Sequence, residues 1–377
     1  EVTDFISDVT SDPALLVVSG ANQAVTVTAS PGGVDITVAE ANNITANAGG
    51  TVTATVSDGD LDTLTGLNAK ANAALSVTVT DTAGTAAELN TVNAGTTSAI
   101  NANAVVTIES STASDLATLM TAAQDTDQFT NTSFVDLTTN GVTITGGTTI
   151  DVTDLNNAIS GTNTVATGAV DLIFSADNAT TTINGGTATE FATTLLTHKT
   201  NNRVSFTGVN LSIDGTTVTT AQANNLTAAT AGTVTTTVSD GDLDTLTGLN
   251  AKANAALSVT VTDTAGTAAE LNTVNAGTTE AVTITNITAI EASTIGAINT
   301  LRSSLASDFT GATNIANISV SGATIDFTAL SSEIDAFNLL NSPTAFALAA
   351  TTTVTLDNQS EVTDFISDVT SDPALLV

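Results

Sequence analysis

The chain has 377 residues, with 38 Asp and Glu against 5 Lys and Arg, giving a formal net charge of −33. This acidic excess argues against binding to nucleic acid or anionic lipid, which requires basic patches. Hydrophobic residues make up 41%, which is normal for a folded protein, and cysteine is absent, which excludes disulfides and thiolate chemistry. No apolar run reaches the roughly 18 residues that a membrane span needs.

The two ends of the chain carry the same sequence. Residues 1–17 and 361–377 both read EVTDFISDVTSDPALLV. Unselected segments of this length do not match by chance, so the ends indicate a tandem repeat. We therefore expect residues 1–360 to form one repeat unit, and residues 361–377 to begin the next one in a longer parent chain.

A second repeat lies inside the first. Residues 51–97 and 233–279 are identical except that Ala54 is replaced by Thr236, and weaker similarity extends these half-repeats to about 34–125 and 216–305. Near-identity between copies is typical of structural arrays. A catalytic chain would gain nothing from it.

Along the chain, alternating Val/Thr runs such as residues 75–81 predict strands, and helix-start signals follow many of them. Each signal is a capping Ser, Thr or Asp, an acidic residue three positions later, and then Leu or Phe. The signals begin, in chain order, at Ser57, Thr85, Thr112, Asp151 and Thr187, and the second half-repeat copies the first two, with Asp242 and Glu270 in the acidic position.

This alternation predicts a mainly β repeat protein. The fold that we expect is a β-solenoid, a β-helix-like stack in which many coils contain a short capped α-helix. The alternative is a string of tandem β-sandwich domains. Such domains typically carry Trp or Tyr in their cores, and this chain has neither residue.

The acidic loop SDGDLDT is the strongest candidate site. It places Asp58, Asp60 and Asp62 at alternate positions, and its copy places Asp240, Asp242 and Asp244 likewise. This resembles the first half of an EF-hand loop, so calcium is the one cofactor that the sequence suggests. The second half of that loop is missing, which favours the other interpretation, helix capping with Ser57 as the cap. The DTDQ loop at 125–128 leaves the same two alternatives.

The single histidine, His198, lies in the only basic cluster, with Lys199 and Arg203. No neighbouring residue type marks out a nucleophile or a partner base. We therefore expect a solvated loop. The alternative is a contact with the acidic surface of a neighbouring chain.

Three stretches, VTVTDTAGTAAELNTVNAGTT, VTATVSDGDLDTLTGLNAKA and VTIESSTASDLATL, resemble the repeats of giant cell-surface proteins of marine picocyanobacteria. The resemblance covers about half of the chain, mostly 34–125 and 216–305. It implies a very long, repetitive extracellular polypeptide with an adhesive, motility or envelope role, and it carries over no catalytic residue.

These observations together predict a structural extracellular protein, not an enzyme, that forms a rod, filament or surface layer on a bacterial cell. Its expected partners are copies of itself, along the same chain and in neighbouring chains, and a surface polysaccharide is a further candidate. The first alternative is the stalk of a calcium-dependent adhesin. More distant alternatives are a β-helix enzyme acting on polysaccharide, whose cleft near-perfect repeats would copy uselessly, and an ice-binding solenoid, suggested by the Thr-x-Thr pairs.

Overall fold

The computed structural model describes residues 24–27, 35–130, 141–145, 148–165, 172–174, 181–340, 345–348, 353–356 and 359–371. The chain divides into two compact units, one comprising residues 1–183 and 194–206, the other residues 184–193 and 207–377. Residues 1–17 and 372–377, which belong to the terminal repeat, lie outside the described residues.

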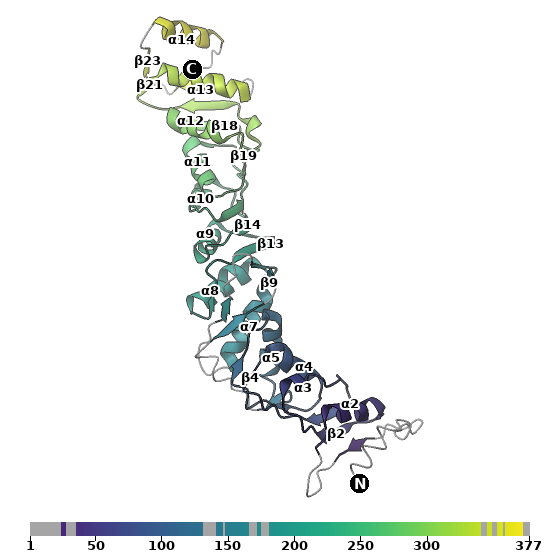
Figure 1. The fold of residues 1–377 in the computed structure, drawn as a ribbon. Coiled ribbons are helices and arrows are strands. Elements are labelled where there is room, and N and C mark those ends of the chain that lie inside the picture. Colours follow the sequence, from purple (N-terminus) through teal and green to yellow (C-terminus); the bar gives the residue numbers. More distant parts are fainter. Residues whose placement is uncertain are drawn as a thin grey trace. The chain divides into compact units, whose positions relative to one another are not determined.

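The predicted fold class is wrong. The chain is an alternating α/β protein whose parallel sheets are flanked by helices, a Rossmann-like alternation rather than a β-solenoid (Figure 1). The described residues contain twelve α-helices, and 39% of these residues are helical. The β-sandwich alternative fails as well, because the strand pairs recorded for the described residues are parallel, whereas sandwiches are built from antiparallel sheets.

The first compact unit begins with a three-stranded sheet in the order β1-β2-β3 and includes a second one, β12-β10-β8, and the pairs β4-β6 and β5-β7. These strands are β1 (Val25–Thr26), β2 (Val52–Thr55), β3 (Ala73–Ser76), β4 (Ala83–Gly84), β5 (Ile100–Asn101), β6 (Thr107–Ile108), β7 (Phe129–Thr130), β8 (Val142–Ile144), β10 (Leu172–Phe174) and β12 (Val204–Ser205); β9 (Thr149–Asp151) also belongs here. Its helices are α2 (Val38–Asn47), α3 (Leu61–Leu64), α4 (Ala86–Ala94), α5 (Ala113–Ala122), α7 (Val152–Val165) and α8 (Leu196–Thr200).

The second compact unit contains the consecutive strands β13, β14 and β15, the four-stranded sheet β16-β18-β20-β22, and the pairs β17-β19 and β21-β23. These strands are β13 (Asn210–Val218), β14 (Val234–Val238), β15 (Ala255–Ser258), β16 (Ala265–Thr267), β17 (Val282–Thr283), β18 (Ala289–Ser293), β19 (Phe309–Thr310), β20 (Asn317–Val320), β21 (Thr324–Asp326), β22 (Ala345–Leu348) and β23 (Thr353–Thr355). Its helices are α9 (Thr220–Ala229), α10 (Leu243–Leu246), α11 (Ala268–Ala276), α12 (Ile295–Ser304), the 3-10 helix η4 (Ala312–Asn314), α13 (Phe327–Leu340) and α14 (Gln359–Ser371). Strand β11 (Thr182–Asn184) and the π-helix η3 (Glu190–Leu195) include residues of both units.

We call one or two strands and the helix that follows them a module. Strands of successive modules pair in parallel, and the two half-repeats use the same register. Val52 lies opposite Ala73 on β2 and β3, and Val234 lies opposite Ala255 on β14 and β15. Helices of adjacent modules contact each other too, as α4 contacts α5 and α11 contacts α12.

Several helix starts follow the predicted capping pattern. Thr85 accepts a hydrogen bond from the Glu88 amide, and the Glu88 carboxylate accepts one from the Thr85 amide, which makes a complete capping box. Thr112 caps α5, and Thr187 and Glu190 form the same reciprocal pair. The prediction that Ser57 is a cap is wrong, because Asp60 is the N-cap of α3.

The core is a row of small aliphatic side chains with phenylalanines between them. Strand β2 buries Val52 and Ala54 and exposes Thr53 and Thr55, the period of two that the sequence predicted. On α4 the buried residues are Ala86, Leu89 and Val92, on one helix face. The bulkiest fully buried side chains are Phe129, Phe191, Phe206, Phe327, Phe337 and Phe346.

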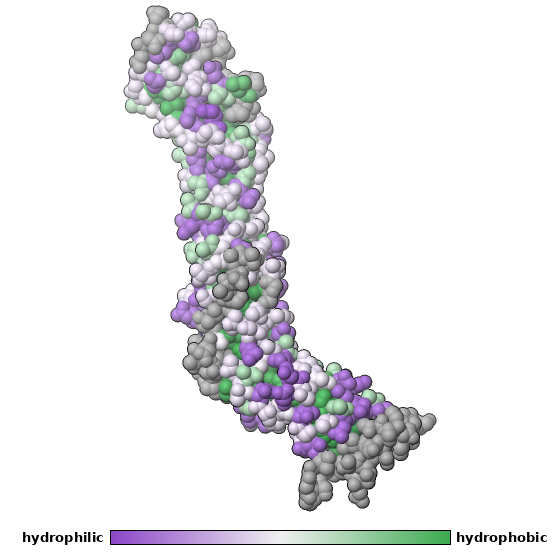
Figure 2. All heavy atoms as spheres, in the orientation of Figure 1, coloured by the Kyte–Doolittle hydropathy of each residue, from purple (hydrophilic) through white to green (hydrophobic). Residues whose placement is uncertain are grey.

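The polar surface is built from short side chains. Figure 2 shows mainly pale and purple residues, with green patches scattered between them. Among the described residues, Val106, Leu339 and Ile366 are the exposed large hydrophobic side chains. No helix in the described part of the chain is long and apolar enough to cross a membrane.

The one difference within the 47-residue repeat gives a stability test. Ala54 and Thr236 are equally buried, at 4% exposure, and the Thr236 hydroxyl has no hydrogen-bond partner among the described residues. An unpartnered buried hydroxyl costs about 1–3 kcal/mol. We predict that Thr236→Val, which keeps the shape and removes the hydroxyl, raises the free energy of unfolding by about 1 kcal/mol, and that Ala54→Thr lowers it. Urea unfolding measures both; a destabilised Thr236→Val variant would contradict this account.

Candidate functional site

The three aspartates of the first acidic loop do not converge on one point. Asp58 accepts a hydrogen bond from the backbone amide of Val38, the first residue of α2, at 2.7 Å. Asp60 caps α3 by accepting from the Thr63 amide at 3.2 Å. Asp62 has an exposed side chain. The first two carboxylates therefore serve the starts of two different helices.

The copy of this loop has the same geometry. Asp240 accepts from the Thr220 amide at the start of α9 at 2.6 Å, and Asp242 accepts from the Thr245 amide at 3.1 Å. Asp244 is exposed like Asp62. In each loop, the first aspartate belongs to the module after the helix that it caps.

We call this contact a cross-cap: a side chain of the following module accepts the first helical N–H of the preceding helix. It recurs along the chain with Asp, Ser or Thr as acceptor. The further pairs are Asp81 with Leu61 N (2.6 Å), Ser111 with Ala86 N (2.9 Å), Thr216 with Ala188 N (3.1 Å), Asp263 with Leu243 N (2.7 Å) and Ser293 with Ala268 N (2.8 Å).

Helix geometry explains why this position takes an acceptor. The first N–H groups of a helix have no intrahelical partner, and the helix dipole favours negative charge there. The N-cap residue of the helix itself satisfies the third amide, as Thr37 does for Glu40 in α2. The cross-cap satisfies the first amide, so a hydrogen bond connects the helix start to the neighbouring module. We call such a hydrogen-bonded contact between modules a joint.

Asparagine side chains form hydrogen bonds between other parts of the helices and the modules that follow them. The Asn72 side-chain amide donates to the carbonyls of Thr45, Ala48 and Gly50 at the end of α2, at 3.0–3.2 Å, and Asn254 repeats this at α9. The Asn42 side chain donates to the Gly66 carbonyl and accepts from the Asn68 amide, both at 2.8 Å. These amides bridge α2 to the module that follows it.

A threonine completes the edge of the last strand in the first sheet. The Leu75 amide on β3 donates to the Thr96 hydroxyl at 3.0 Å, and that hydroxyl donates to the Leu75 carbonyl at 2.8 Å. Thr278 makes the same pair with Leu257 on β15. The buried hydroxyl thus bonds the amide and the carbonyl of one strand residue, as the backbone of a neighbouring strand would.

The described residues contain no group of three or more His, Asp or Glu side chains that could hold a metal ion. The calcium hypothesis for Asp58, Asp60, Asp62, Asp240, Asp242 and Asp244 remains a prediction. At the DTDQ loop, Asp125 accepts from the Gln128 side chain and the Asp127 amide, and these hydrogen bonds lower the pKa of its carboxyl.

The prediction of a solvated loop at His198 is wrong. His198 lies on α8, is only 7% exposed, and places its Nε2 3.5 Å from the Ser160 hydroxyl of α7. Its Nδ1 has no partner within the described part of the chain, so no acid orients the ring for catalysis. Burial, with the nearby Arg203 charge, lowers the pKa of His198. Lys199 lies over the Phe206 ring at 5.0 Å.

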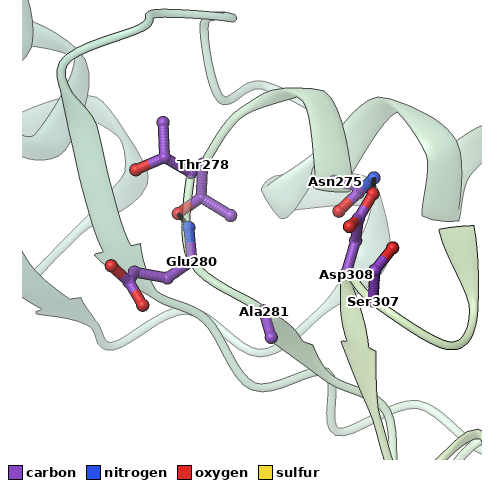
Figure 3. A pocket seen from close by; sticks show the side chains of 7 residues that line it. Asn275, Thr278, Glu280, Ala281, Ser307 and Asp308 are labelled. Carbon is purple, nitrogen blue, oxygen red and sulfur yellow. Dashed lines mark hydrogen bonds between the residues drawn. The ribbon is translucent and has the colours of Figure 1, made fainter.

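A shallow polar hollow of about 250 Å³ lies in the second compact unit (Figure 3). It is lined by side chains that include Asn275, Glu280, Ser307 and Asp308, and Asn275 donates to Asp308 at 3.3 Å. The first half-repeat has Ser98 where this one has Glu280. The lining of the hollow therefore differs from the corresponding residues of the first half-repeat, unlike the cross-caps, which both share.

No protein-family model matches the chain, and no curated protein matches its sequence. Function is therefore inferred from the hydrogen-bonded joints between modules, the surface and the repeats themselves.

The cross-caps give a stability prediction with built-in controls. Asp58→Ala and Asp81→Ala each leave a helix N–H without its acceptor, so each should lower the free energy of unfolding by about 1–2 kcal/mol. Asp240→Ala and Asp263→Ala should match them, whereas exposed Asp62→Ala and Asp244→Ala should change it by less than about 0.5 kcal/mol. Equal costs for Asp58 and Asp62 would contradict the cross-cap.

The same melts, repeated with calcium at constant ionic strength, test the ion hypothesis. If a cation binds the two loops, calcium raises the unfolding midpoint of the parent chain, and this rise is smaller after Asp62→Ala and is lost when Asp244→Ala is added. If the carboxylates serve only as caps, calcium shifts the parent chain and Asp62→Ala equally.

The buried histidine gives a pH prediction. Because the folded pKa lies below the ordinary value of about 6.5, the unfolded chain binds the proton more readily. The contribution of neutral His198 is fully present above pH ~6.5 and is lost as the pH falls from there toward the folded pKa. We expect this component of the pH dependence to disappear in His198→Gln, measured by urea unfolding between about pH 7.5 and 5.5. Identical pH curves for both chains would contradict it.

Proposed function

We propose that this chain is a structural extracellular protein of a bacterial cell, whose repeat units build a filament or surface layer. The observation that carries the proposal is the duplication of the joints. Asp58 and Asp240, Asp81 and Asp263, Asn72 and Asn254, and Thr96 and Thr278 make the same hydrogen bonds in both half-repeats.

Close packing between modules is duplicated in the same way. A Cβ added at Gly84 would lie 2.3 Å from the Leu61 Cδ1, and one added at Gly266 would lie 2.2 Å from the Leu243 Cδ1. Contacts this short mean that a larger residue would have to displace the leucine side chain of the neighbouring module, so glycine allows the close packing at both places. The residues that the duplication preserves thus serve module-to-module contact.

The differences between the half-repeats support the same proposal. Val38 and Ala54 correspond to Thr220 and Thr236 in the core, and Ser98 corresponds to Glu280 at the rim of the polar hollow. A binding or catalytic site needed in every copy would keep its own lining residues. Here the joints are kept and the hollow changes.

The charge and surface chemistry suit a position outside the cell. A net charge of −33 favours solubility and opposes tight contact with other acidic surfaces. The absence of cysteine removes dependence on the redox state of the compartment. The resemblance to giant picocyanobacterial surface repeats points to the same location.

Labelling of intact cells tests this proposal. Antibodies against the purified chain, with gold-labelled detection in the producing organism, should decorate the surface of unpermeabilised cells, and proteinase K treatment of those cells should remove the label. A cytoplasmic protein serves as the control for intactness. Label that appears only after permeabilisation would overturn the proposal; a surface label that calcium chelation releases would favour the adhesin stalk.

A further inference from the structure

The last helix of the described chain carries the repeated terminal sequence. Residues 361–371, EVTDFISDVTS, form most of α14, which packs beside α13 (Figure 1). The Phe365 ring meets the Phe327 ring edge-on, with centroids 5.3 Å apart and an interplanar angle of 84°. The Thr328 hydroxyl donates to the Glu361 carboxylate at 3.2 Å.

This contact has a defined receiving surface. Phe327, the first residue of α13, is only 1% exposed, whereas Phe365 is half-buried. An edge-to-face aromatic pair is directional, so it selects both the partner ring and its approach. The start of α13 therefore acts as a seat for a helix that carries Glu and Phe four positions apart.

We propose that residues 1–11, which have the same sequence as residues 361–371, dock on α13 of a second copy of this chain whenever its own α14 has left that seat, with Phe5 in the place of Phe365. The occupant follows from the identity of the two segments, since the same side chains at the same spacing present the same contacts. The inference deepens the proposed structural role and rests on it, by naming the seat and the segment that join one repeat unit to the next.

The ends of the sheets in the described chain fit this junction. Strands β22 and β23 are the last strands of their sheets, and β1 is the first strand of its sheet. Edge strands offer unpaired backbone groups that accept a further strand. Of the three exposed large hydrophobic side chains among the described residues, two lie here, Leu339 at 87% and Ile366 at 59% exposure. A following copy would cover Leu339 on α13, whereas Ile366 lies on the side of α14 that faces away from the seat.

The experiment uses the full chain with point substitutions. Phe365→Ala should release α14 from its seat, and the vacated seat should then bind residues 1–11 of another copy. Sedimentation velocity should show concentration-dependent head-to-tail oligomers for Phe365→Ala. The double variant Phe5→Ala/Phe365→Ala should stay monomeric, because it has an open seat but no matching segment. Ile366→Ala, which changes the exposed side of the same helix, is the matched control and should behave like the parent chain.

A labelled peptide of residues 1–17 provides a second measurement. It should bind the Phe5→Ala/Phe365→Ala chain, whose seat is open and cannot be filled by a neighbour, and should bind the parent chain at least about tenfold more weakly. The peptide with Phe5→Ala should also lose at least about tenfold in affinity. Phe365→Leu, a milder change, repeats the test if the alanine variants lose circular dichroism.

The proposal is overturned if the Phe365→Ala chain stays monomeric and ignores the peptide, or if the Phe5→Ala peptide binds as tightly as the parent peptide. Because the assay needs only purified chain, its failure leaves the surface label unaffected. Surface label without docking would mean a structural protein whose units join by another route. Docking without surface label would mean that the units join through α13 but that the protein does not lie on the cell surface.

Discussion

The structure depends on one group that a helix cannot satisfy by itself, the first N–H at its start. At seven helix starts of the described chain a side chain of the next module accepts it, most often Asp. These modules are therefore incomplete without their successors. Parallel strand pairing adds to this dependence, because a strand edge needs a partner that the next module supplies. Hydrogen bonding and sheet formation thus favour the same outcome: modules that are stable in series.

This arrangement also gives the negative charge a structural use. With 38 acidic residues and 5 Lys and Arg, the chain cannot balance its carboxylates with ion pairs, and the described residues contain a single one, Arg302 with Glu333. Helix N-termini supply partial positive charge without basic side chains. Asp58, Asp81, Asp240 and Asp263 each bond a helix-start amide at 2.6–2.7 Å. Helix dipoles therefore stabilise some of the carboxylates that lysine and arginine would stabilise by ion pairing in other proteins.

The sequence predicted the strand alternation, the duplication and several caps, because these are local signals. The Thr85–Glu88 box is one example. The fold class was wrong because helix length was underestimated. Helices α2 and α9 begin at Thr-x-x-Glu and Thr-x-x-Gln without a following Leu or Phe, so the pattern used did not detect their ten residues. The cross-caps join residues about 20 positions apart on different modules, and nothing local marks Asp81 as the partner of Leu61. An Asp that recurs 20 positions after four of the helix starts was the available signal.

The two half-repeats show which of these features the fold requires. Where the sequences differ, the structure tolerates the change: a buried Thr236 replaces Ala54 at the same exposure, and Glu280 replaces Ser98 at a polar surface. The shared residues include the aspartates that bond helix-start amides and the glycines that lie against a leucine of the neighbouring module. A core of small aliphatic residues accepts such exchanges at a cost of about 1 kcal/mol each. A missing cross-cap costs a comparable amount but acts on two modules at once, since it weakens the helix and the joint together. We therefore expect selection on an array of modules to act strongly on the joints, and the joints are kept in both copies, residues 51–97 and 233–279.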